Sequence, residues 1–474
     1  MPEHTPSHTP CFEHPQYADR SPALADAYRL LDSALITYQG KAVGTMASPD
    51  PRAPAENYQD CFVRDFVSAG LVMLLEGRSD IVRSFLSLIM HLRDQQEEIE
   101  GQQVAPGVLP ASFRVVQNAS GEETLIADFG DRAIGRVAPV DSMMWWAILL
   151  RAYVHSTGDT GFAKTPEVQR MLRMILNLCL QSRFEVFPTL LVPDGSFMID
   201  RRMGVNGHPI EIQALFDMTL RCAELLEADE GNRWLVDLAV RRRHVLKEYI
   251  QNYYWLDMDE LNRVNRFSTE MFGQDVDNLF NIYPESIPGW VPDWLPDGAG
   301  YFVGNLGPGR IDFRFFSQGN LLALVAGLAS PSQSQGMMNL IEQRWDDLIG
   351  RMPMKLVYPA IESHEWRLIT GSDPKNTPWS YHNGGNWPVL IWSLTAAAVS
   401  CGREDLAKRA YEVAENRLLR DGWPEYYDGR HGRLMGRKAN LHQVWSATGL
   451  IFAQHLLDDP SKLERLGFTG TALS

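Results

Sequence analysis

The side chains of this 474-residue sequence with the clearest chemical potential are carboxylates in loops rich in glycine, proline and aromatic residues. The densest group, between Asp194 and Gln213, contains Asp200 followed directly by Arg201 and Arg202. Guanidinium groups can fix a carboxylate through charge-assisted hydrogen bonds. They also favour its ionised form, so Asp200 can act as a general acid only if burial or a second carboxylate offsets them. An Arg-paired structural loop is the alternative interpretation.

A second carboxylate, Glu425, lies among aromatic residues in the segment Trp423–Gly429. Apolar surroundings of this kind suit a carboxyl group to proton transfer near neutrality. An ordinary surface turn is the alternative, because Asp428-Gly429 is a common turn dipeptide. Two carboxylates from separate loops, one on each side of a bond, are the arrangement used for glycoside hydrolysis. Composition does not choose the pair, and other carboxylates compete for the two roles: Asp65, Asp194, Glu211, Glu362 and Glu365.

Sugar-binding signals gather between Trp379 and Trp387, where aromatic, imidazole and amide side chains share one glycine-containing stretch. Aromatic rings stack on the apolar faces of sugars, and polar groups bind the hydroxyls. A single histidine such as His382 is more often structural than catalytic. Two further segments, 57–65 and 136–146, each place an Arg and an Asp at the start of a predicted helix, where an Asp is also a common cap.

Several other chemistries lack their motifs in this sequence. It contains no phosphate-binding glycine loop, no dinucleotide fingerprint, no paired-histidine zinc motif and no nucleophile elbow. We therefore expect neither a cofactor nor a metal. A formal net charge of -15 argues against nucleic-acid and anionic-membrane partners. No stretch is long enough to span a membrane. Scattered cysteines and a polar N-terminus without a signal-peptide core predict a cytoplasmic protein, and a homo-oligomer is compatible with the sequence.

Helical periodicity dominates the chain. It predicts about a dozen helices, near residues 22–38, 64–77, 79–98, 139–157, 166–181, 208–227, 230–255, 317–329, 332–349, 386–401, 404–419 and 440–457. Long loops rich in glycine, proline and aromatic residues alternate with short connections, and we expect no strands at regular spacing. This alternation indicates paired helices in a ring with the long loops at one mouth. We expect an N-terminal extension, residues 1–20, followed by a single domain, residues 21–474.

Read together, blocks spread over residues 24–458 resemble the alkaline/neutral invertases (glycoside hydrolase family 100) of plants and cyanobacteria. The most specific are Met198-Ile-Asp-Arg-Arg-Met-Gly204 and the run from Gly371 to Gly385. The other matching blocks are 63–66, 134–142, 209–213, 281–284, 304–306, 312–316, 365–367 and 423–427.

The resemblance implies an all-α fold, an (α/α)6 barrel that hydrolyses sucrose to glucose and fructose without a metal, in the cytosol or an organelle. It makes Asp200 the general acid and Glu425 the general base. The residues expected in the sugar site are Phe62, Arg64, Asp65, Asp141, Trp145, Arg201, Gln213, Trp379, His382 and Asn383. Asp60-Cys61 and Met143-Met144 depart from the usual pattern, and both departures bear on the specificity for sucrose.

We expect hydrolysis with inversion, which requires the two carboxyl groups to lie about 6.5–9.5 Å apart, whereas a spacing near 5 Å indicates retention. Because Asp200 must stay protonated, we predict that Arg201 or Arg202 points towards another carboxylate. Two alternatives share the scaffold: hydrolysis of another α-glucoside, and sugar epimerisation, which would need facing histidines. A sugar-binding protein without catalysis is the remaining alternative.

Overall fold

The computed structural model describes residues 20–51, 56–93, 98–99, 102–130, 139–182, 187–192, 197–199, 201–266, 282–307 and 310–468. Asp200 and the side chain of Arg201 lie outside the described residues, as do residues 1–19 of the extension expected at residues 1–20.

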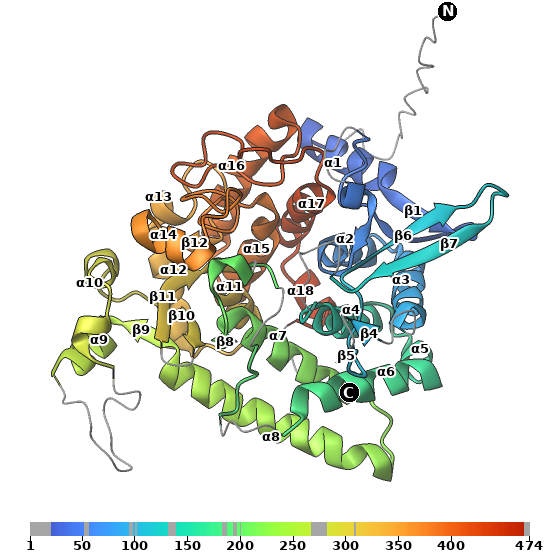
Figure 1. Ribbon diagram of the computed structural model, residues 1–474, viewed down its shortest axis with the longest axis horizontal. Helices are drawn as coiled ribbons and strands as arrows, with labels where there is room; N and C mark the ends of the chain where they lie inside the picture. The colour runs from blue at the N-terminus through green and yellow to red at the C-terminus, as the bar shows by residue number, and fades with distance from the viewer. Residues whose placement is uncertain are drawn as a thin grey trace, which may run out of the picture.

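Within the described ranges, six helices form a closed inner ring. Each packs against the next, and the last returns to the first. Figure 1 looks into this ring, with the six labels arranged around the centre of the molecule. In chain order the inner helices are α2 (Val63–Leu75), α4 (Ser142–Thr157), α7 (Ile210–Arg221), α11 (Ser317–Val325), α15 (Ile391–Ser400) and α17 (Val444–Asp458).

Outer helices alternate with the inner ones along the chain and cover the ring (Figure 1). They are α1 (Pro22–Ser33), α3 (Ser79–Leu92), α6 (Pro166–Leu180), α8 (Glu230–Tyr253), α12 (Pro331–Gln343) and α16 (Glu404–Asp421). The first outer helix, α1, packs on the last inner helix, α17. This is the predicted (α/α)6 barrel, and each of the twelve predicted helices has its counterpart.

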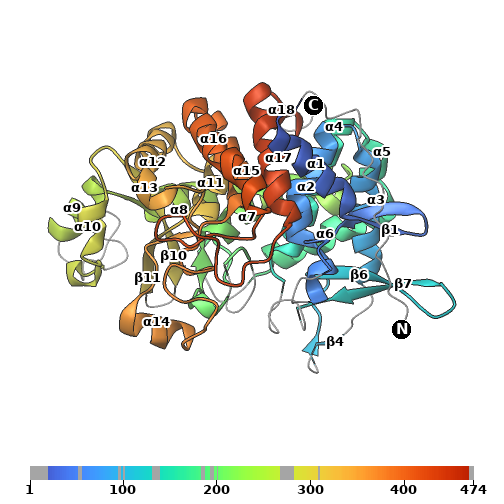
Figure 2. The ribbon, with the colours of Figure 1, turned by 90° about the horizontal axis from the view of Figure 1, so that it is seen from above.

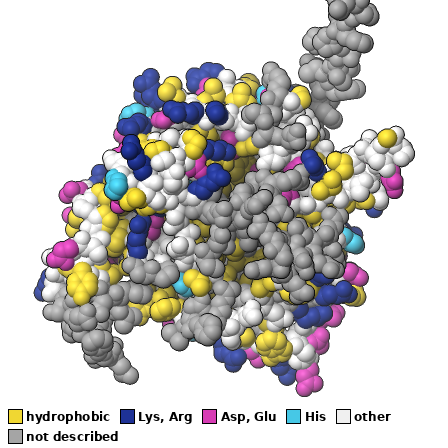
Figure 3. Space-filling model, in the orientation of Figure 1, with side chains coloured by type: hydrophobic (Ala, Val, Ile, Leu, Met, Phe, Trp, Pro, Cys, Tyr) yellow, Lys and Arg dark blue, Asp and Glu magenta, His cyan; other side chains and the backbone are white. Residues whose placement is uncertain are grey.

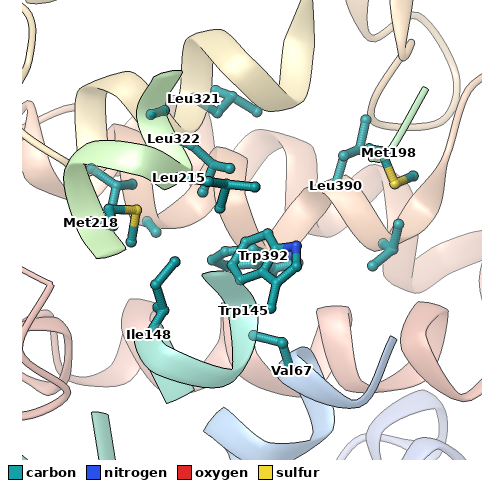
Figure 4. Close-up of a cluster of buried hydrophobic side chains, with 14 of the residues drawn as sticks. Val67, Trp145, Ile148, Met198, Leu215, Met218, Leu321, Leu322, Leu390 and Trp392 are labelled. Carbon is teal, nitrogen blue, oxygen red and sulfur yellow. The ribbon is translucent and has the colours of Figure 1, made fainter. Parts of the chain in front are cut away.

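Burial explains which helices are inside. All nine residues of α11 are buried, whereas the 24-residue α8 buries one narrow stripe from Asn232 to Ile250. A helix that is covered on every side belongs in a core, and an amphipathic helix belongs at the surface. The core is one continuous cluster, and Figure 4 shows part of it, with Trp145 and Trp392 packed between α2, α4 and α15.

The connections alternate as expected. Short ones, such as 76–78 and 401–403, lead from an inner helix to the next outer one, and the long ones lead back inwards. The long connections lie on one side of the ring, where Figure 2 shows β4, β6, β7, β11 and α14 below the helices. They therefore collect at the N-terminal ends of the inner helices.

Short strands lie in the long connections, for which the sequence predicts loops. β1 (Leu35–Tyr38) and β2 (Lys41–Thr45) form a hairpin, and β3 (Cys61–Phe62) pairs with β6 (Ser112–Gln117), which pairs with β7 (Glu123–Asp128). The largest sheet joins β12 (Val357–Tyr358), β11 (Arg310–Phe316), β10 (Gly300–Gly307) and β8 (His208–Pro209), with β9 (Trp255–Asp257) also on β10. β4 (Glu98–Ile99) and β5 (Gln102–Gln103) form a separate pair.

The remaining elements are short helices. They are α5 (Thr160–Ala163), α9 (Met258–Arg266), α10 (Trp290–Trp294), α13 (Trp345–Leu348), α14 (Ser363–Thr370) and α18 (Lys462–Arg465). The 3-10 turns are η2 (Glu56–Gln59), η4 (Arg201–Met203), η5 (Cys222–Leu225), η6 (Pro284–Ser286) and η7 (Pro388–Leu390). Among the helices described, none is both long and apolar enough to cross a membrane.

Candidate active site

The predicted site residues that the structure describes gather at the mouth, where the inner helices begin. A small cavity lies there on the ring axis, and side chains from five of the six ring helices line it: Arg64 from α2, Trp145 from α4, Gln318 from α11, Trp392 from α15 and Trp445 from α17. Figure 3 shows this face of the molecule hollowed near its middle, with hydrophobic side chains in the hollow. The ring therefore brings together residues that are nearly 400 positions apart in the chain.

An ion pair links two of the ring helices at this mouth. Arg64, in the first turn of α2, donates through Nε to Asp141 Oδ2 and through Nη2 to Asp141 Oδ1 over 3.0 Å. Asp141 is 1% exposed and precedes the first residue of α4. A bidentate pair of this kind fixes both partners in direction as well as in distance. Both residues were predicted for the sugar site, and the pair joins the two helix starts that carry them.

Two further carboxyl groups near Arg64 have raised pKa values. Burial raises the pKa of Asp65 to about 7, and Glu425 and Asp141 add to the rise while Arg64 opposes it. Burial likewise raises the pKa of Glu211 to about 8, against a hydrogen bond from the Met198 amide and the charge of Arg64. The second oxygen of Glu211 is buried without a hydrogen-bond partner in the described structure, which fits a neutral carboxyl group.

Glu425, the predicted general base, is 3% exposed and held from both sides. Tyr58 Oη donates to Glu425 Oε1 over 2.7 Å, and Asn440 Nδ2 donates to Oε2 over 3.2 Å. The negative charge of Glu425 contributes to the raised pKa of Asp65. Tyr58 is 367 residues away from Glu425 in sequence, so the contact between these two residues exists only in the folded ring.

The aromatic stretch predicted to stack on sugar supplies one wall. Trp379 is half-buried, adopts a φ of 65°, and donates from Nε1 to Glu362. The ring of His382 stacks on Tyr381 at a centroid distance of 4.1 Å. Burial, together with the nearby positive charges of Lys375 and Arg64, holds the pKa of His382 well below its usual value. The imidazole is therefore neutral and can both donate and accept hydrogen bonds.

Two residues predicted to bind sugar bond instead to the backbone. The side-chain amide of Gln213 accepts from the Leu190 N–H and donates to the carbonyls of Leu190 and Pro209. Asn383 accepts from the Ile361 N–H and donates to the carbonyls of Ile361 and Asn376. Both side chains have no exposed surface, so they shape the loops of the mouth and present no amide group to a ligand.

The remaining predicted residues have simpler surroundings. Phe62 is half-buried at the end of β3, directly before α2. Trp145 is 2% exposed, packs edge-on against Trp392, and has an indole N–H without a hydrogen-bond partner in the described structure. Phe62 is therefore partly exposed, whereas Trp145 is buried and lines the axial cavity.

The chain on both sides of Asp200 reaches this region. Met198 lines the axial cavity together with Arg64, and its amide N–H donates to Glu211 Oε1 over 3.0 Å. On the other side, Arg202 Nη1 donates to Asp373 Oδ2 over 2.9 Å. One of the two arginines after Asp200 therefore pairs with another carboxylate, as predicted.

Sequence reasoning missed Tyr58 and Asn440, whose side chains bond the Glu425 carboxylate in the described part of the chain. Tyr58 lies in a segment that was selected for its Arg and Asp, and nothing local relates it to Glu425. Asn440 follows Glu425 by 15 positions. For Asn440, the available signal was a polar residue in the glycine-containing loop between α16 and α17.

A family model described as "Alkaline and neutral invertase" matches residues 27–460, which is most of the chain. The chain belongs to this invertase family. Cytosolic invertase 1 of Oryza sativa subsp. japonica is 51% identical over 445 residues, covering 93% of this chain and 79% of the relative. Alkaline/neutral invertase CINV2 of Arabidopsis thaliana is 49% identical over 445 residues, covering 93% and 80%. Neutral/alkaline invertase 1, mitochondrial, of Oryza sativa subsp. japonica is 50% identical over 444 residues, covering 92% and 71%.

Solved structures share the fold of this invertase-family chain at much lower identity. A GH63 mannosylglycerate hydrolase from Thermus thermophilus, in complex with glucose, superimposes with a TM-score of 0.54 at 15% identity, covering 92% of this chain and all of that one. A bacterial glucoamylase complexed with acarbose gives a TM-score of 0.54 at 10% identity, covering 93% and 57%. These likenesses establish the fold class of the invertase-family chain.

Proposed function

We propose that this invertase-family enzyme hydrolyses sucrose to glucose and fructose with inversion, using Asp200 as general acid and Glu425 as general base. The observation that carries the proposal is the pair of contacts on Glu425. Tyr58 and Asn440 each bond one of its oxygens at the mouth, so the carboxylate has a fixed direction. Family membership supplies the substrate class, and the names of the relatives support sucrose.

The surroundings of Asp200 in the chain are compatible with the acid role. Glu211 and Arg202 hold the chain before and after it, and Arg202 is engaged by Asp373.

In the proposed reaction, Glu425 takes a proton from a water molecule while the oxygen of that water attacks the anomeric carbon. The glycosidic C–O bond breaks at the same time, and Asp200 gives its proton to the leaving oxygen. Exchange with solvent then returns a proton to Asp200 and removes one from Glu425. Arg64, Asp141 and Asp65 are proposed to bind sugar hydroxyls at the floor, with Trp379 and His382 at one wall and Phe62, Trp145 and Arg201 completing the site.

The test is glucose release from sucrose by the wild type, Asp200→Asn and Glu425→Gln, with maltose and trehalose as control substrates. Loss of turnover by several orders of magnitude in both variants, with sucrose alone cleaved by the wild type, supports the proposal. Binding of sugar should survive in Asp200→Asn, which separates an enzyme from a simple binder. Cleavage of maltose or trehalose in place of sucrose would overturn the substrate assignment.

Two product measurements address the stereochemistry. Hydrolysis in ¹⁸O-labelled water shows which sugar takes up the label, and thus which anomeric carbon is attacked. Proton NMR during the first minutes shows whether that carbon emerges inverted. Retention at the labelled carbon would reject Glu425 as a general base.

We also propose a cytoplasmic location, which the scattered cysteines favour, although the named relatives include both cytosolic and mitochondrial proteins. Self-association is a further proposal. Size-exclusion chromatography with light scattering decides it directly.

A further inference from the structure

Lys355 is a buried lysine behind the active site, and neither the proposed reaction nor the sugar contacts use it. It lies between α13 and β12 and is 2% exposed. Its backbone is fixed, because its N–H donates to the Leu348 carbonyl and its own carbonyl accepts from Ser317 Oγ. A buried ammonium group is expensive unless it is well paired, so its contacts should matter.

The ammonium group of Lys355 contacts three chain segments. It donates to the Gly429 carbonyl and to Asn386 Oδ1, the latter over 3.4 Å. It also lies 5.2 Å from the centre of the Trp379 ring, within the range of a cation–π interaction. The positive charge of Lys355 thus joins three places: the Trp379 ring, Asn386, and the turn at Gly429 that follows Glu425.

Backbone bonds connect the same segments. The Gly429 N–H donates to the Trp379 carbonyl over 2.7 Å. Asn386 and Tyr427 exchange two backbone hydrogen bonds, of 3.0 and 2.7 Å, and Tyr427 is only two positions after Glu425. The packing leaves no room for a side chain at Gly429, because an added Cβ would overlap the Gly384 carbonyl oxygen. Any shift at Lys355 would therefore move both segments.

Burial and nearby charges have opposite effects on the pKa of Lys355. Burial lowers the pKa of Lys355 to about 8, while Asp347 and Asp428 oppose that shift. Both of these carboxylates lie on segments packed against the lysine, so the charged form is compensated within the same cluster.

We propose that Lys355 is a positioning residue that fixes the Trp379 ring and the segment carrying Glu425 relative to each other. It acts through the Gly429 carbonyl, Asn386 and the indole face. The roles of Trp379 and Glu425 rest on the proposed function, whereas the mechanical link between their segments does not.

The first test compares Lys355→Met with a matched control, Arg151→Met. Arg151, in the C-terminal half of α4 and away from the mouth, is also a buried cation, paired with Glu224 and the Gly467 carbonyl. Both variants should lose stability. Only Lys355→Met should lower kcat/KM for sucrose, by about 10- to 100-fold, because small displacements of catalytic groups cost this much. In Lys355→Met, displacement of Glu425 should lower kcat, and displacement of Trp379 should raise KM.

A double-mutant cycle with Trp379→Leu separates positioning from general weakening. If the lysine acts through the indole, Trp379→Leu should cost several-fold less in the Lys355→Met background than in the wild type. Additive losses would overturn the link to Trp379. An unchanged kcat/KM in Lys355→Met, with stability lowered as in Arg151→Met, would overturn the proposal as a whole.

Hydrogen exchange provides a readout that needs no turnover. The Gly429 and Tyr427 amides should exchange at least tenfold faster in Lys355→Met and keep wild-type rates in Arg151→Met. If the wild type does not cleave sucrose, the proposed function fails, yet this measurement still tests the link. Unchanged exchange at these amides would overturn it. Should Lys355→Met not fold, Lys355→Gln takes its place with the same criteria.

Discussion

The two halves of the active site are built differently. On one side, Arg64, Asp65, Asp141 and Glu211 all lie at or within one turn of the start of a ring helix, and they interact through charge. On the other side, the stretches 376–386 and 423–440 carry aromatic residues and Glu425 on irregular backbone. Buried amides and one lysine hold that backbone in place.

The two sides differ in what holds their side chains in position. A helix start is fixed by the packing of the whole ring, so its side chains inherit a defined direction. A loop has no such support and must satisfy its own backbone groups, since unpaired buried polar atoms cost about 1–3 kcal/mol each. Asn383 and Lys355 meet that need. Trp379, Tyr381 and Trp423 all adopt positive φ, which is sparsely populated for such residues and is held by these surroundings.

The largest expected effect is on the helix side, from Asp141→Asn. Removing the carboxylate leaves Arg64 partly buried without its charge partner, which typically costs about 3–5 kcal/mol. Sucrose turnover should fall below detection. Thermal and denaturant unfolding measure the first effect and glucose release the second. Asp217→Asn is the matched control, because Asp217 in α7 is 2% exposed and pairs with Arg221 of the same helix and with Arg243 of α8. It should lose comparable stability and keep activity; equal activity losses would contradict the comparison.

The second effect concerns Glu211 and pH. Its folded pKa of about 8 lies above its unfolded value near 4.5. The wild type therefore has its full stability from this group below pH 4.5 and loses it as pH rises towards 8. Glu211→Gln should gain stability relative to the wild type between pH 5 and pH 9, by an amount on the order of 2–5 kcal/mol.

Urea unfolding of both proteins at each pH measures this difference. Glu76→Gln is the control, since a hydrogen bond with His455 lowers the pKa of Glu76 to about 2 against the effect of burial. The stability from Glu76 is present above pH 4.5 and is lost as pH falls towards 2, so the control should show no gain over the same range. A flat difference for Glu211→Gln would mean that Glu211 is ionised in the folded protein.

On the loop side, Asn383→Ala should cost about 2–3 kcal/mol of stability and raise KM about tenfold, because Ile361 and Asn376 lose their partners. Asn320→Ala offers an unusually close match. Asn320 in α11 accepts from the Phe302 N–H and donates to the carbonyls of Phe302 and Phe316, so it makes the same three kinds of bond without touching the aromatic wall. Similar stability losses with KM raised only in Asn383→Ala are expected. KM raised equally in both would remove the distinction.

The smallest effect is expected from Tyr58→Phe, which removes one hydrogen bond to Glu425 and leaves the ring. A loss of about 1 kcal/mol, or roughly fivefold in kcat, with KM unchanged, is the expected result of steady-state kinetics. A rise in KM larger than the fall in kcat would indicate that Tyr58 binds the substrate and does not orient the base.

Sequence patterns predicted the helices well because each outer helix shows one apolar stripe and each inner helix is apolar on most sides. They did not predict the strands: β1 lies at the end of the helix predicted for residues 22–38, although Ile36 and Thr37 are β-branched. Residue types indicated which segments form the site, but they did not predict where each side chain points. Gln213 and Asn383 stand in the expected blocks, yet their amides turn to the backbone. Tyr58 could not be linked to Glu425, because only ring closure brings them together.

Ring closure also has a consequence for how the protein is made on the ribosome. α2 must bond to α17, for instance through Ser68 and Thr448, which are 380 residues apart. Until the last inner helix has been synthesised, the apolar flanks of α2 and α15 have no cover. Contacts of such long range slow folding and leave aggregation-prone surface exposed in the meantime. The nascent chain should therefore depend on chaperones until its final helix emerges, and a stop codon before α17 should yield insoluble protein rather than a smaller enzyme.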